Sequence, residues 1–321
     1  MDMLFSGASD LVAYGPGVDA RALAILLAVL AAVALAFGAQ FQNDAVVEKA
    51  KQTPKKGAKL GRGSLSLKQL FALLSKPKWL SGTAFMAIGI VLQLAALSLA
   101  PLIVVQPVGA IALVITSLLN AKVTKTKLNR GTIIAVSLCT FGIAAFVAMA
   151  SGVADETVLN DDRLREVLGV LGAILVIFTV LFFTLGRHAK ALTYVIGAGV
   201  LYGFVATLAK VVIQRIYQSE FEWLTLLCLI ALIGAVSLGS WFVQNAYSSG
   251  PPDLVIAGLT VIDPLVAVSI GIVILGEATS ASLPVIIGFG FSAVVAVIGV
   301  ILLSKVHPEL SRPRAQTEGK I

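Results

Sequence analysis

The sequence predicts an all-α membrane protein with nine transmembrane helices, and three observations lead to this fold class. Hydrophobic residues make up 58% of the 321 positions and charged residues only 13%, with a mean hydropathy of +0.97. The charges are grouped, which leaves uncharged runs such as 22–41 and 283–304. Runs of about 20 apolar residues match the ~30 Å hydrocarbon layer at about 1.5 Å of helix rise per residue. The pattern excludes a soluble enzyme, a nucleic-acid-binding protein and a disulfide-linked secreted domain.

Each predicted span is an apolar run bounded by charged or polar residues. The first is not read as a cleaved signal peptide, because acidic Asp2, Asp10 and Asp19 precede it in place of a basic segment. The nine spans are 22–41, 79–99, 101–120, 131–150, 167–186, 194–213, 223–244, 254–275 and 284–304.

The basic residues predict the orientation, because cytoplasmic loops are enriched in Lys and Arg. With the N-terminus outside, 19 of the 24 Lys and Arg residues lie inside, in segments 42–78, 120–130, 187–193 and 305–321. Arg21, Arg163, Arg165 and Arg215 lie outside. We therefore expect the N-terminus outside and the C-terminus inside, in a bacterial cytoplasmic membrane.

An internal repeat divides the spans into two groups. Segment 104–121 aligns without a gap with segment 261–278, so that Gln106-Pro107 matches Asp263-Pro264. The two segments run in opposite directions through the membrane, which predicts an inverted repeat of four plus five helices. Inverted repeats are typical of secondary transporters, whose binding site lies near the bilayer midplane between the halves.

The expected organisation follows from the spans and the repeat. Residues 1–21 form an extracytoplasmic segment, and residues 305–321 form a cytoplasmic tail. The first repeat occupies 22–150 and contains a basic cytoplasmic loop, 42–78, in which Ser64–Lys78 has the pattern of an amphipathic interfacial helix. An acidic outer loop, 151–166, leads to the second repeat at 167–304.

Several motifs resemble those of a known superfamily. They are Ala100-Pro101 followed by Gln106-Pro107, the span-ending Gly276-Glu277, and Gly203 with Lys210 in span 6. The pattern resembles the drug/metabolite transporter superfamily, especially its EamA-type repeats. Segment 79–150, which opens with Trp-Leu-Ser-Gly, is similar to the NIPA-type magnesium transporters of that superfamily. The resemblance implies two inverted five-helix halves, from which this chain lacks the first helix.

Ionisable and amide side chains inside spans are the candidate binding residues, because such groups are costly in hydrocarbon. Asp263 lies at mid-depth and is the expected ligand if a metal binds. Lys210 has two alternatives, pairing with Asp263 or extending to the outer headgroups. Glu277 is expected at the outer surface. The candidate substrate-binding residues are Asp263, Gln106, Lys210, Gln93, Gln40 and Tyr202, and the candidate helix-kinking residues are Pro107 and Pro264.

The functional hypothesis is a secondary transporter of the drug/metabolite type that moves a small solute by alternating access. Two alternatives remain open: a NIPA-like transporter of magnesium or another divalent cation, and a non-transporting scaffold or partner subunit with a dry interior. We expect no enzymatic activity and no cofactor, because the chain carries no catalytic or nucleotide-binding motif. The expected partners are the solute or ion and the lipid bilayer, with no nucleic acid; a homodimer is one option for the assembly.

Overall fold

The computed structural model describes residues 18–52, 77–123, 130–155, 159–185, 191–219, 222–249 and 252–306, and every regular element in these ranges is a helix. Nine stretches of the described residues are long and apolar enough to cross a membrane, so the predicted all-α fold with nine spans is confirmed. Apart from Pro77 and Lys78, which begin a helix, the segment Ser64–Lys78 lies outside the described residues.

The helices follow the predicted spans with small shifts at their ends, except that α2 continues well past the predicted end at 41, to Gln52. The first half of the chain forms α2 (Val18–Gln52), α4 (Pro77–Leu99), α5 (Leu102–Gly109), α6 (Ile111–Val123) and α7 (Arg130–Val153). The second half forms α8 (Asp161–Leu185), α9 (Ala191–Tyr217), α10 (Trp223–Ser249), α11 (Pro252–Val273) and α12 (Leu283–Val306). The third span is α5 followed directly by α6, with an interruption at Ala110.

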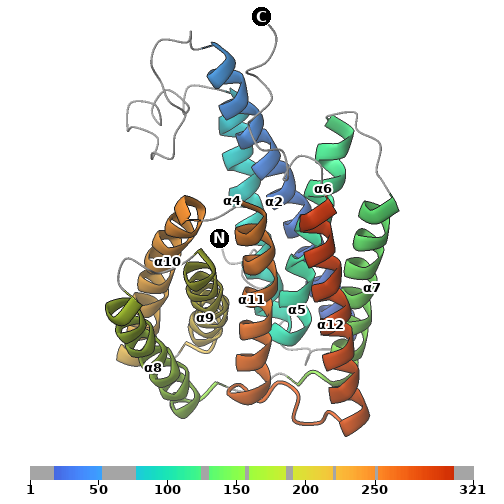
Figure 1. The fold of residues 1–321 in the computed structure, drawn as a ribbon. Helices are drawn as coiled ribbons and strands as arrows, with labels where there is room; N and C mark the ends of the chain where they lie inside the picture. The colour runs from blue at the N-terminus through green and yellow to red at the C-terminus, as the bar shows by residue number, and fades with distance from the viewer. Residues whose placement is uncertain are drawn as a thin grey trace, which may run out of the picture.

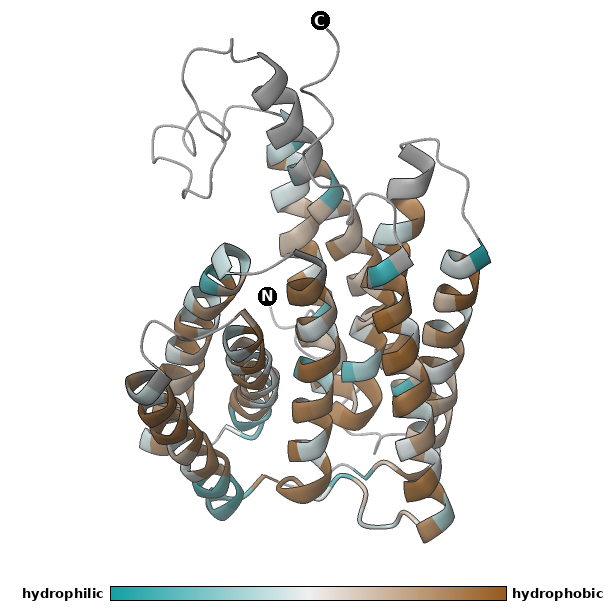
Figure 2. Cartoon of the chain, viewed as in Figure 1, coloured by the Kyte–Doolittle hydropathy of each residue, from teal (hydrophilic) through white to brown (hydrophobic). Residues whose placement is uncertain are grey.

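The outer surface of the helix bundle is apolar, as a lipid-facing surface must be. Phe183 is 85% exposed, and Leu283 and Phe291 are also largely exposed. Figure 2 shows hydrophobic colour along the helices, with hydrophilic residues gathered mainly near their ends. This distribution fits a bilayer as the solvent around the bundle.

Small residues allow the helices to approach closely. A Cβ on Gly299 of α12 would lie 2.4 Å from the backbone nitrogen of Cys139 on α7. The motif Gly199-x-x-x-Gly203 of α9 lies against Ile262 and Val266 of α11 in the same way. Small-residue contacts of this kind replace the hydrophobic effect, which does not drive association between helices inside lipid.

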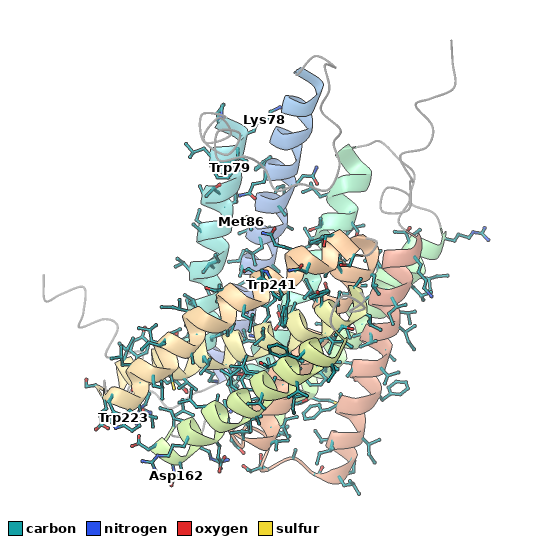
Figure 3. The ribbon with its side chains drawn as sticks, turned by 60° about the vertical axis from the view of Figure 1, so that its left-hand side comes forward. Lys78, Trp79, Met86, Asp162, Trp223 and Trp241 are labelled. Atoms are coloured by element: carbon teal, nitrogen blue, oxygen red, sulfur yellow. The ribbon has the colours of Figure 1, made fainter. Side chains whose placement is uncertain are left out.

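Figure 1 defines two ends of the bundle, which are used below. At the lower end α8 begins and α11 ends; at the upper end α2 and α12 end. Trp79 lies in the first turn of α4 near the upper end, whereas Trp223 is the first residue of α10 at the lower end (Figure 3). The closest helix pairs are α2 with α4, α9 with α10 and α11, and α7 with α12.

Helix α9 is the central helix, and α8 is peripheral. Buried residues make up 61% of the apolar window of α9 but only 17% of that of α8. Helix α8 packs on α10 and α9 through few contacts, with its remaining faces exposed. A polar side chain on α9 is therefore held by neighbouring helices on several sides.

Cationic side chains at the lower end bind backbone carbonyls where helices finish. Arg21 of α2 donates to the carbonyls of Ser151 and Ala154 at the end of α7. Arg163 of α8 donates to the carbonyl of Ile274, just after α11. The last carbonyls of a helix have no intrahelical donor and carry its negative dipole end, so these contacts stabilise the lower ends of the helices.

Candidate functional site

A buried ion pair at the lower end of the bundle connects α9 with the segment that follows α11. Lys210 Nζ of α9 lies 3.1 Å from Glu277 Oε1, four residues beyond the end of α11. The two side chains are only 3% and 2% exposed. Each charge therefore depends on its protein partners rather than on water for stabilisation.

The pair holds the turn between α4 and α5. Lys210 also donates to the carbonyl of Ala100 at 2.9 Å, directly after the C-terminal end of α4. The two oxygens of Glu277 accept from the backbone N–H groups of Leu102 and Ile103 at 2.9 and 3.0 Å, at the N-terminal end of α5. A cation at a helix C-terminus and an anion at a helix N-terminus are both favoured by the helix dipoles. At the Ala100-Pro101 motif the Lys210 cation therefore meets the negative end of α4, and the Glu277 anion meets the positive end of α5.

Two glycines place the Glu277 carboxylate. Gly276 has φ 72°, a left-handed conformation that suits glycine, and it turns the chain back after α11. The backbone N–H of Glu277 then donates to the carbonyl of Gly271 at 2.9 Å. A Cβ on Gly271 would lie 2.6 Å from Glu277 Oε2, so the carboxylate occupies space that only glycine leaves free.

This arrangement corrects two expectations from the sequence. Lys210 neither pairs with Asp263 nor extends to the headgroups, because its ammonium group is enclosed by Glu277 and the Ala100 carbonyl. Glu277 is not a surface residue, because the chain folds back over the last turn of α11. A charged residue directly after a long apolar span, preceded by glycine, is the signal that could have indicated this role.

Asp263, unlike Glu277, has a buried carboxylate oxygen to which no described residue donates. It lies at the middle of α11, and its buried Oδ1 atom has no hydrogen-bond partner among the residues that the structure describes. The backbone at Asp263 faces Gly199 of α9. A buried carboxylate oxygen without a donor is costly, so this atom is a candidate for binding a cation or a proton.

The structure brings the two predicted prolines together. Pro107 of α5 and Pro264 of α11 line one small cavity of about 60 Å³, with residues of α7 and α12. Helix α11 continues through Pro264, whereas the third span is interrupted three residues after Pro107. Gln106, next to Pro107, is 7% exposed on α5, which packs against α11. The repeat-related dipeptides therefore sit on neighbouring helices.

A larger cavity of about 380 Å³ lies between α2, α4, α6 and α11. Its lining is mainly apolar, with Leu35, Met86 and Leu113 among the contributors. Thr116, Ser117 and Thr260 supply hydroxyl groups, and Thr260 also lines the smaller cavity at the prolines. Space for a solute is thus present beside the half of α11 that precedes Asp263.

The remaining candidate residues lie elsewhere in the bundle. The Tyr202 hydroxyl is 3.3 Å from Ser240 Oγ, so this side chain faces α10, while Gly199 and Gly203 of the same helix face α11. Gln93 is half-buried on α4, and Gln40 is buried on α2. Among the described residues, no three His, Cys, Asp or Glu side chains gather as a metal site. A cation at Asp263 would therefore complete its coordination with neutral oxygens or water.

A family of known proteins matches most of the chain. The model of the family described as magnesium transporter NIPA matches residues 20–308. An uncharacterized protein of Corynebacterium glutamicum is 27% identical over 289 residues, which cover 88% of this chain and 95% of that protein. No solved structure matches the chain. The family match covers all nine membrane-spanning stretches, so this integral, multi-pass membrane protein belongs to the NIPA magnesium transporter family, a family of membrane transporters within the drug/metabolite transporter superfamily.

Proposed function

We propose that the protein transports Mg²⁺, or a closely related divalent cation, and that Asp263 binds the ion at mid-membrane. The observation that carries this proposal is the buried Asp263 Oδ1 atom, for which the described part of the chain supplies no hydrogen-bond partner. The description of the family supports the choice of cation. Mg²⁺ retains several waters and is usually bound through one or two carboxylates, so a single acid at depth is compatible with it.

The arrangement of charges supports this assignment. Lys210 is a buried cation on α9, the helix that packs on α11, but its ammonium group is engaged by Glu277 at 3.1 Å and by the Ala100 carbonyl. Its charge is thereby balanced by a carboxylate other than Asp263. Asp263 remains available for a mobile cation.

Transport by alternating access would use the two inverted halves. The support is the opposite direction of α4 and α10, each with a tryptophan in its first turn, and the similar packing of α2 on α4 and α9 on α10 (Figures 1 and 3). Helix α8 would be the helix without a counterpart. The halves meet most extensively where α7 packs on α12, and they also meet where α5, which carries Gln106, packs on α11, which carries Asp263. Inverted repeats place the substrate site at such a junction.

The test is Mg²⁺ flux in proteoliposomes that contain an entrapped Mg²⁺ indicator. We expect wild-type flux, and at least about a tenfold loss in Asp263→Asn, the loss that corresponds to about 1.4 kcal/mol of ion binding. Asp162→Asn is the matched control, because Asp162 is largely exposed on α8 and forms an ion pair with Arg165 of the same helix. Normal flux through Asp263→Asn would contradict the proposal.

A small organic solute is the second candidate. The mainly apolar lining of the 380 Å³ cavity favours it, because a hydrated dication gains little from contact with Leu35 or Met86. Folded wild-type protein that passes no Mg²⁺ but takes up an organic solute would select this candidate. The scaffold alternative requires a dry interior with Lys210 and Asp263 paired, and the cavity and the Lys210–Glu277 pair speak against it.

A further inference from the structure

We propose that Glu277 is a second cation-binding residue at the lower end of the transport path, and that Lys210 is a built-in cation that occupies this site until the transported ion takes its place. This inference rests on the proposed function. It concerns the step in which the ion leaves Asp263 and passes the lower end of the bundle.

The first argument is geometric. The ammonium group of Lys210 sits between two oxygens, Glu277 Oε1 at 3.1 Å and the Ala100 carbonyl at 2.9 Å. If the ammonium group withdraws, these oxygens face a vacated cationic position. One carboxylate and one carbonyl, completed by water, are a suitable ligand set for Mg²⁺.

The second argument is electrostatic. Glu277 accepts hydrogen bonds from the N–H groups of Leu102 and Ile103, at the positive end of the α5 dipole. These hydrogen bonds do not depend on Lys210, and a negative charge is favoured at this end of a helix. Removal of the lysine charge therefore leaves the negative charge of Glu277 in place, and this charge attracts another cation.

The third argument is the position of the pair. Glu277 follows α11 and Lys210 belongs to α9, whereas the turn at Ala100 belongs to the first half of the chain. The pair therefore connects the two proposed halves at the lower end, and both side chains are nearly fully buried. Opening toward this end would move the turn at Ala100 away from Lys210 and Glu277, so the ammonium group would lose one of its two acceptors and a dication could replace it at Glu277.

The first experiment uses full-length wild-type protein in detergent and measures acetylation of Lys210 by mass spectrometry. Lys305, which is exposed at the upper end, is the internal control. We expect Lys210 to be protected without Mg²⁺ and to be labelled severalfold faster with saturating MgCl₂ at constant ionic strength, while Lys305 is unchanged. Labelling of Lys210 that does not respond to Mg²⁺ would overturn the proposal.

The second experiment compares thermal unfolding of Lys210→Gln with that of Lys210→Gln/Glu277→Gln. Both variants carry Asp263→Asn, so that binding at Asp263 does not contribute. We expect MgCl₂ to raise the unfolding temperature of the first variant, saturably, by about 2–4 °C or more, and to leave the second unchanged. Equal responses would show that Glu277 is only a structural partner of Lys210. Because Asp263 is absent from both variants, the result is independent of whether Asp263→Asn abolishes flux.

Discussion

Two carboxylates of the second half, Asp263 within α11 and Glu277 just after it, differ in how the protein treats them. Glu277 receives two backbone N–H donors and the Lys210 ammonium group. Asp263 lies deeper in the span, and its buried Oδ1 has no donor. The comparison teaches that burial alone does not tell how a carboxylate is used: an oxygen without a donor can bind an ion directly, whereas an oxygen with committed partners binds one only after a partner is displaced.

The largest loss of stability is expected when Glu277, the carboxylate with several partners, loses its charge. Glu277→Gln leaves the Lys210 charge buried without its counter-ion, and removing one partner of a buried pair costs about 3–5 kcal/mol. We expect a large drop in unfolding temperature and in the yield of folded protein in detergent. A variant as stable as wild type would show that Lys210 has another counter-charge.

Removing both charges should be less harmful than removing one. In Lys210→Met/Glu277→Gln no uncompensated charge remains, so we expect recovery of at least about 1 kcal/mol relative to Glu277→Gln alone. A double-mutant cycle on thermal unfolding, completed with Lys210→Met, measures this coupling. Additive losses would mean that the two residues act separately.

The sequence predicted the fold far better than the partners of its charges. Hydropathy and span length were sufficient for nine spans. The Gly199-x-x-x-Gly203 spacing permits close approach of another helix, but it does not say that this helix is α11. The Lys210–Glu277 pair could not be derived in this way, because it depends on the fold-back at Gly276 and on free backbone groups at the Ala100-Pro101 turn. These are properties of helix ends, and small shifts in a helix end change which side chain reaches them.

An intermediate effect is expected when the space for Glu277 is filled. In Gly271→Ala the new Cβ would lie 2.6 Å from Oε2, which forces the carboxylate away from α5. We expect a loss of about 1–3 kcal/mol, the usual cost of overpacking. Gly290→Ala in α12 is the matched control: a Cβ there meets nothing within 4 Å, so it should be neutral or slightly stabilising. Equal stability of both variants in thermal unfolding would mean that the Glu277 carboxylate can be held elsewhere.

The smallest change in stability, and the sharpest test of the comparison, is expected at Asp263. Asp263→Asn keeps the size of the side chain and removes a charge whose buried oxygen has no donor, so stability without Mg²⁺ should stay within about 0.5 kcal/mol of wild type or rise. The wild-type protein should gain stability as Mg²⁺ is added, because an ion that binds only the folded state shifts unfolding to higher temperature. Asp263→Asn should lose the part of that gain due to the mid-membrane site. A marked loss of stability without Mg²⁺ would instead give Asp263 a structural role like that of Glu277, and the contrast between the two carboxylates would then lie in position alone.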